Sequence, residues 1–110
     1  MLFGSKEDKI TKIIAKGKED GLLKFLTDKD EKIRVAAIDG LAKVTSTRAS
    51  FPLIDQLKDP SPVIRAHTAT ALGAIGDPHT KEFILQAIQT EKDPDALAAM
   101  KASLGKIKNY

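Results

Sequence analysis

The sequence contains no cysteine and no tryptophan, and its only aromatic residues are four phenylalanines and one tyrosine. The absence of cysteine excludes disulfides, thiolate metal ligands and a cysteine nucleophile. No apolar run approaches the ~20 residues that a transmembrane helix requires. The first residues, MLFGSKEDK, hold too short an apolar stretch for a secretory signal. We therefore expect a cytoplasmic protein that does not enter a membrane.

An excess of charge of one sign is also missing. The chain has 18 basic and 15 acidic residues, a net charge of +3, and no run of five like charges. Because nonspecific affinity for nucleic acid requires clustered Lys and Arg, we rank nucleic acid below protein as a partner. The length of 110 residues supports one domain over residues 1–110.

An internal repeat organises the chain. A shift of 31 residues places Leu22 on Leu53 and Leu41 on Leu72. A third copy follows once one extra residue is allowed in the segment 90–92. Repeats of this length are the sequence signature of stacked units, each of which contacts mainly its neighbours.

Each repeat reads as two helices. Its first half has apolar residues at i, i+1 and i+4, and its second half at i, i+4, i+5, i+8 and i+11, which are both helical spacings. Strand-like alternation is poor. The predicted helices span about 6–16, 20–27, 31–45, 48–58, 62–75, 79–90 and 94–108. Their short connections predict that successive helices are antiparallel neighbours.

Capping residues agree with these boundaries. Asp30, Ser61 and Asp93 occupy the same place in each repeat, where a side-chain oxygen can accept a helix N–H group. Pro62 and Pro94 follow two of them at the first helical position, where a missing N–H costs nothing.

Three further residues bear on the boundaries. Gly17 and Gly76 stand where helices are expected to end in a left-handed conformation. Pro52 would disturb a helix interior, so the helix that contains it should begin late or be kinked.

The segment 59–78, DPSPVIRAHTATALGAIGDP, resembles a HEAT repeat of the short bacterial type first associated with phycobilin lyases. Residues 28–44 and 93–107 carry the same pattern with departures, and the resemblance covers about residues 20–108. It implies an all-α fold, a right-handed α–α superhelix with first helices on the convex face and second helices on the concave face. We expect a leading helix at 5–16 and three HEAT-like repeats at 20–45, 48–76 and 78–108.

The resemblance also implies a ladder of arginines and aspartates between neighbouring repeats. The residues in the corresponding places are Arg34, Arg65, Asp28, Asp59 and Asp77. Intramolecular pairing is the favoured interpretation, and an anion-binding site on the inner face is the alternative.

The remaining polar positions of the second helices give a candidate partner-binding strip. Its residues are Lys12, Asp39, Lys43, His67, Thr70 and Lys106. A groove for an acidic or amphipathic partner segment and an ordinary solvated face are both open interpretations of this strip.

Metal and catalytic sites are not indicated. His67 and His79 lack the i, i+4 spacing of a helical metal pair, so we expect neither a metal nor a cofactor. No phosphate-binding glycine loop and no nucleophile with a base at a recognisable spacing occur.

These observations predict a non-enzymatic protein–protein interaction scaffold that binds a helical or extended partner segment on its concave face. The alternatives are a nucleic-acid-binding HEAT-like protein and an accessory subunit or chaperone of an enzyme such as a lyase-type complex. A monomer is favoured over a homodimer. The apolar residues 1–3 would either cover the first repeat or mediate association.

Overall fold

The computed structural model describes residues 5–108, which form seven α-helices and no strand. The α-helices are α1 (Lys6–Lys16), α2 (Glu19–Leu23), α3 (Glu31–Val44), α4 (Ser50–Gln56), α5 (Pro62–Ile75), α6 (Lys81–Thr90) and α7 (Pro94–Lys106). Short 3₁₀ helices cover Lys24–Thr27, Thr47–Ala49 and Pro78–Thr80. The prediction of an all-α helical repeat fold is confirmed. None of the described helices has the length and apolar character needed to cross a bilayer, and residues 1–3 lie outside the described range.

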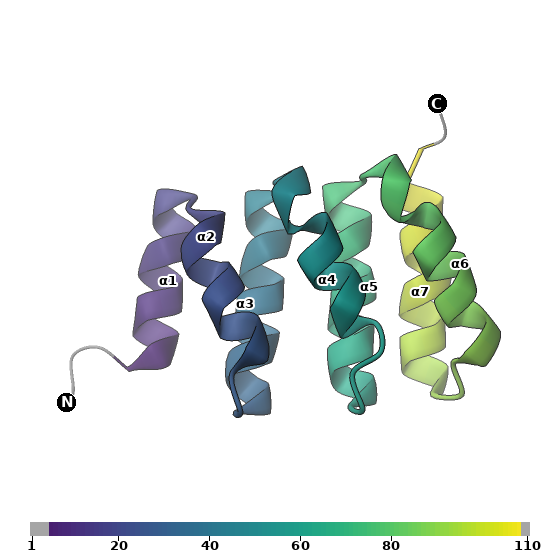
Figure 1. The fold of residues 1–110 in the computed structure, drawn as a ribbon, viewed down its shortest axis with the longest axis horizontal. Helices are drawn as coiled ribbons and strands as arrows, with labels where there is room; N and C mark the ends of the chain where they lie inside the picture. The colour runs from purple at the N-terminus through teal and green to yellow at the C-terminus, as the bar shows by residue number, and fades with distance from the viewer. Residues whose placement is uncertain (1–4, 109–110) are drawn as a thin grey trace.

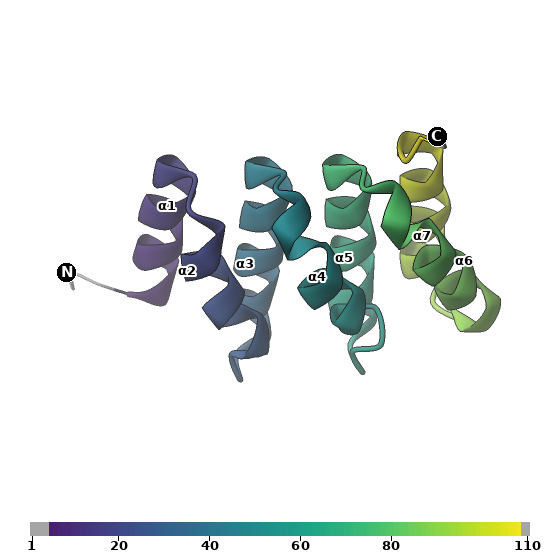
Figure 2. The ribbon, with the colours of Figure 1, turned by 45° about the horizontal axis from the view of Figure 1, so that its top comes forward.

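The helices form two layers in an elongated stack whose extents are 44 × 29 × 17 Å (Figures 1 and 2). One layer, which we call the second-helix layer, contains α1, α3, α5 and α7 side by side. The other, the first-helix layer, contains α2, α4 and α6. The chain enters all four helices of the second-helix layer from the same edge, the lower one in Figure 1. Their carboxyl ends therefore share the opposite edge.

Local capping chemistry explains where these helices begin. The side chains of Asp30, Ser61 and Asp93 each accept a backbone N–H group in the first turn of α3, α5 and α7, respectively. Pro62 and Pro94 are the first residues of α5 and α7. The three helices thus start in register because the same cap recurs in each repeat.

The helix ends are more varied. Gly17 and Gly76 terminate α1 and α5 with φ of 66° and 72°. Thr45 ends α3 with φ of 57°, although it carries a β-branched side chain that disfavours this conformation. Thr45 stands 31 residues before Gly76, the equivalent position of the next repeat. The left-handed backbone conformation is therefore the same in both repeats, although only one of them has glycine there.

The first-helix segments differ from the continuous helices predicted for them. The predicted helix at 48–58 is a 3₁₀ turn followed by α4, which begins at Ser50. Pro52 consequently falls in the first turn of α4, where its missing N–H is tolerated. The predicted helices at 20–27 and 79–90 are likewise divided between a 3₁₀ and an α segment.

A buried stripe runs between the two layers. Its fully buried large side chains include Leu22, Ile38, Leu41, Leu53, Ile64, Leu72, Ile84 and Met100. A particularly close approach of two helices is at Gly73, inside α5 and not at its end. A Cβ atom placed on Gly73 would lie 2.9 Å from the Cβ atom of Ser103 in α7. The packing of this layer therefore depends on small residues as well as on the apolar stripe.

Candidate functional site: a basic edge and an outer groove

Acidic and basic side chains are sorted between the two edges of the second-helix layer. The first turns of α1, α3 and α7 carry Glu7, Asp8, Glu31 and Asp95, whereas their last turns carry Lys16, Lys43 and Lys106. Because these helices are parallel, the lysines gather at one edge. We define the basic edge as Lys16, Lys18, Lys43, Lys106 and Lys108, all of which are exposed.

The acidic residues near the basic edge are already bound by other groups. Arg48 holds Glu19 and Asp20 at 2.9 and 3.2 Å. Asp77 is buried and accepts a hydrogen bond of 2.8 Å from Ser50. Within residues 5–108, the lysines of the basic edge have no ion-pair partner. The five lysines and Arg48 outnumber these three carboxylates, so this edge presents a net positive charge.

The opposite edge carries a second set of interactions between repeats, centred on Arg34 and Arg65. Arg65 forms a bidentate pair with Glu91, with Nε–Oε1 at 2.7 Å and Nη2–Oε2 at 2.9 Å. Arg65 Nη1 also donates to the backbone carbonyls of Asp59 and Pro60. The guanidinium beside Glu91 holds the pKa of that carboxyl below its usual value, against the effect of burial. Arg65 thus joins the loop before its own helix to the loop before α7.

The same arrangement is looser one repeat earlier. Arg34 donates to the carbonyl of Asp28 at 2.8 Å, but its Nη2 atom is 3.9 Å from Asp59 Oδ2. The Nε atom of Arg34 is buried without a hydrogen-bond partner. Asp59 is one methylene shorter than Glu91, which accounts for the weaker contact. At the start of the stack, a lysine takes the part that the arginines play later: Lys6 Nζ lies 2.7 Å from Asp28 Oδ2.

The network differs from the sequence expectation at two residues. Glu91, which was not expected in it, accepts the hydrogen bonds of Arg65. Asp77, which was expected in it, lies at the other edge with Ser50 and His79. The extra residue at 90–92 is the signal that could have located Glu91. Once that residue is allowed, Glu91 aligns with Asp28 and Asp59.

The structure distributes the six strip residues over the second-helix layer. Asp39 of α3 and His67 of α5 lie 2.8 Å apart, Oδ1 to Nδ1, and both side chains are partly exposed. Lys43 and Lys106 belong to the basic edge. Lys12 and Thr70 are exposed, Lys12 one turn before Lys16.

Ser50, Asp77 and His79 form a cluster with the residue types of a catalytic triad. His79 Nδ1 is 3.0 Å from Asp77 Oδ1, and Ser50 donates to Asp77 Oδ2. The carboxylate stands between the serine and the histidine, and Ser50 is fully buried. Burial works to raise the pKa of Asp77, yet the hydrogen bonds from Ser50 and His79 outweigh it and lower that pKa. The geometry is that of a cap at the start of the 3₁₀ helix Pro78–Thr80, and histidine cannot activate this hydroxyl.

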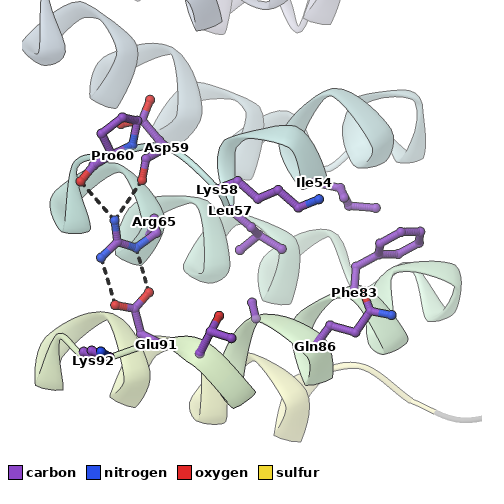
Figure 3. A pocket seen from close by; sticks show the side chains of 12 residues that line it. Ile54, Leu57, Lys58, Asp59, Pro60, Arg65, Phe83, Gln86, Glu91 and Lys92 are labelled. Carbon is purple, nitrogen blue, oxygen red and sulfur yellow. Dashed lines mark hydrogen bonds and ion pairs between the residues drawn. The ribbon is translucent and has the colours of Figure 1, made fainter.

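A cavity of about 480 Å³ opens between α4 and α6 on the first-helix layer (Figure 3). We call it the outer groove. Ile54, Leu57 and Phe83 supply apolar walls, and Lys58 and Lys92 stand at its margin. Its far end is closed by the Arg65–Glu91 pair. In the described part of the chain, no group of three or more His, Cys, Asp and Glu residues could hold a metal ion.

Comparison with known proteins gives a consistent set of matches. A family model of HEAT repeats matches residues 19–109. Epoxyqueuosine reductase of Bacillus subtilis (strain 168) is 44% identical over 50 residues, which are 44% of this chain and 13% of the enzyme.

Solved structures of the same enzyme also match. Epoxyqueuosine reductase with a tRNA-Tyr epoxyqueuosine-modified tRNA stem loop is 36% identical, with a TM-score of 0.67. That match covers 70% of this chain and 21% of the other. The Bacillus subtilis enzyme, solved with its catalytic loop swung out of the active site, is 28% identical, with a TM-score of 0.73 and coverage of 79% and 28%. The chain thus spans between 13% and 28% of the length of these relatives.

Two sequence-based predictions are wrong in the light of these matches. The prediction of a non-enzymatic interaction scaffold is contradicted because the relatives are enzymes, of which this chain resembles a part. The ranking of nucleic acid below protein is contradicted because a relative was solved with a tRNA stem loop. The second prediction was wrong because it rested on net charge. In the net charge of the chain, the acidic residues of the first helical turns cancel the lysines that the fold gathers at one edge.

Proposed function

This chain belongs to the HEAT-repeat family, and from that premise we propose that it is a module that binds structured RNA, such as a tRNA stem loop. The observation that carries the proposal is the relative solved with a tRNA stem loop, which is 36% identical over 70% of this chain. The unpaired lysines of the basic edge, which give it a net positive charge, supply the chemistry that RNA phosphates require.

The basic edge is the surface that we propose for the RNA backbone. Its lysines come from three parallel helices and from the segments that follow two of them, so they form a row and not a single cluster. Lysine is a flexible point charge that suits phosphate contacts without base recognition. Double-stranded RNA is recognised mainly by shape and backbone contacts, which need few aromatic side chains.

The relatives also suggest which process the module serves. Because this chain matches a part of a reductase named for epoxyqueuosine, we propose that it acts in the modification of RNA by holding the substrate. In this role Lys12, Asp39, His67 and Thr70 would flank the bound RNA on the second-helix layer. We propose a cytoplasmic location, in keeping with a chain that has no cysteine to form a disulfide.

Charge reversal of the basic edge tests the proposal. We expect the triple variant Lys16→Glu, Lys43→Glu and Lys106→Glu to bind a fluorescently labelled tRNA stem loop at least about tenfold more weakly, because it replaces attraction of phosphates by repulsion. Fluorescence anisotropy measures the affinity, and circular dichroism checks that helicity is kept.

A matched control separates this surface from net charge. The triple variant Lys9→Glu, Lys24→Glu and Lys29→Glu changes the charge by the same amount at exposed residues outside the basic edge. It should retain most of the affinity. An equal loss in both variants would show that net charge governs binding, and no binding by the unaltered protein at low salt would exclude RNA as the partner.

A further inference from the structure

The aromatic wall of the outer groove is the ring of Phe83, which is open to solvent and packs against Phe51 outside the groove. Phe83 is 40% exposed and Phe51 is 59% exposed, although both are large apolar residues. Their ring centroids are 6.2 Å apart with an interplanar angle of 83°, an edge-to-face pair between α6 and α4. This pairing holds the Phe83 ring beside Ile54 at the mouth of the groove (Figure 3). An exposed and positioned aromatic ring is a surface on which a planar group can stack.

The carboxylates of the groove are already satisfied. Both carboxylate oxygens of Glu91 accept hydrogen bonds from Arg65. Oε2 also accepts a hydrogen bond of 3.0 Å from the backbone N–H of Asp93. Asp59 accepts the backbone N–H of Ser61 at 2.9 Å and faces Arg34. The acidic side chains therefore have little capacity left for a ligand.

Unlike Arg65, the two lysines of the groove are not satisfied in this way. Lys58 and Lys92 are exposed, and neither ammonium group has an ion pair within residues 5–108. Gln86, also exposed, adds an amide that can both donate and accept hydrogen bonds. The Phe83 ring, the Gln86 amide and the two unpaired lysines together complement a ligand that has a planar polar ring and a negative charge.

The size of the groove narrows the range of ligands that it can hold. A cavity of about 480 Å³ lies within the range of small-ligand sites and is suited to one nucleotide. A partner helix, in contrast, needs a long open channel, and the Arg65–Glu91 pair closes one end of this groove.

We propose that the outer groove binds one nucleotide, with the base stacked on Phe83 and the phosphate beside Lys58 or Lys92. The inference deepens the proposed function and rests on it, since an unpaired nucleotide of a bound RNA is one source of this group. A free nucleoside monophosphate has the same chemistry and is the other. Bases stack on aromatic side chains with little regard to sequence, and lysines at the rim track the phosphates.

The groove is separate from the basic edge. Lys58 and Lys92 follow α4 and α6, close to the loops that lead into α5 and α7. The basic edge lies at the other ends of those helices. Variants of the two surfaces can therefore be tested independently in the same chain.

Nuclear magnetic resonance titrations of the ¹⁵N-labelled protein test the proposal. The probes are adenosine monophosphate, a single-stranded hexanucleotide of adenosine, and inorganic phosphate as a reference. We expect the first two to shift backbone amides of residues that line the groove, such as Leu57, Gln86 and Ala87, and phosphate alone to shift them far less. Phe83→Ala should weaken the nucleotide affinity about tenfold, because it removes the stacking surface.

Leu85→Ala is the matched control. Leu85 is a similarly exposed apolar residue of α6, at 37%, and it does not line the groove, so its loss should leave the affinity unchanged. The pair Lys58→Gln and Lys92→Gln should weaken nucleotide binding, whereas Lys9→Gln should not. Tighter binding of the hexanucleotide than of the monophosphate would identify RNA as the source, and equal binding would identify the free nucleotide.

Three results would overturn the inference: no shifts at the groove with either nucleotide probe, equal shifts with phosphate alone, or equal losses in Phe83→Ala and Leu85→Ala. Its failure is distinguishable from failure of the proposed function. If stem-loop binding depends on Lys43 and Lys106 while the groove takes no nucleotide, the function stands without this site.

Discussion

At the residue scale, Arg65 and Glu91 form a bidentate ion pair between two repeats. The Glu91 side chain is 2% exposed and that of Arg65 is 21% exposed, so water weakens the pair far less than it weakens a surface ion pair. Loss of one member would leave the other charge partly buried and uncompensated. The pair should therefore contribute to stability in proportion to the ionisation of Glu91.

Replacement of this carboxylate tests that view. We expect Glu91→Gln to lower the free energy of unfolding by about 1–3 kcal/mol at neutral pH, because Arg65 loses its charged acceptor. Urea denaturation followed by circular dichroism measures the change. Glu82→Gln, at an exposed residue of the first turn of α6, should have little effect.

The effect of Glu91→Gln should depend on pH. The folded protein lowers the pKa of Glu91 below its usual value of 4.5. The stabilisation is therefore fully present above pH 4.5 and is lost as the pH falls through the folded pKa. The difference between the variant and the unaltered protein should shrink in acid, and a constant difference from pH 7 to pH 3 would contradict this account.

At the element scale, the contact of α5 with α7 depends on a missing side chain. The Cβ atom of an alanine at position 73 would lie 2.9 Å from Ser103 Cβ and 3.0 Å from its Cα atom. The Cα atom belongs to the backbone of α7 and cannot rotate away. Two helices of the second-helix layer are thus held close by glycine facing serine.

Two glycine-to-alanine changes separate packing from helix propensity. Gly73→Ala should destabilise the protein by about 1–3 kcal/mol, since α7 must move to accept the new methyl group. Gly105→Ala meets no atom within 4 Å, so it should stabilise α7 by up to about 1 kcal/mol. Thermal unfolding of both variants measures these changes, and a stabilising Gly73→Ala would show that the two helices are not in tight contact.

At the scale of the whole molecule, parallel stacking converts ordinary helix-end preferences into a surface. Acidic residues in first turns and lysines in last turns each favour the helix dipole locally. Because α1, α3 and α7 point the same way, these preferences add across the stack. A chain with a net charge of only +3 thereby presents one edge at which unpaired lysines outnumber the acidic side chains.

Salt dependence follows from this arrangement. If three phosphates are neutralised by Lys16, Lys43 and Lys106, stem-loop affinity should fall about 40-fold between 50 and 200 mM salt, from a slope of about −0.9 per phosphate. Fluorescence anisotropy over this range measures the slope. The triple charge-reversed variant should lose most of the slope, and a salt-independent affinity of the unaltered protein would argue against phosphate contacts.

The sequence by itself determined the helical repeat. Asp30, Ser61 and Asp93 cap their helices through bonds to residues two or three positions away, so the caps could be read from the chain alone. The apolar stripe of Leu41 and Leu72 is equally local, because its period is that of the α-helix. What the sequence settled is therefore what depends on near neighbours in the chain.

Only the tertiary structure decided which distant residues meet. Lys16, Lys43 and Lys106 share an edge because their helices stack in parallel, and spacing along the chain does not reveal this. Arg65 reaches Glu91 across 26 positions, and Phe51 meets Phe83 only when α4 and α6 lie side by side. Surfaces that hold a ligand combine side chains from several repeats, and the geometry of the stack, more than local preference, sets their arrangement.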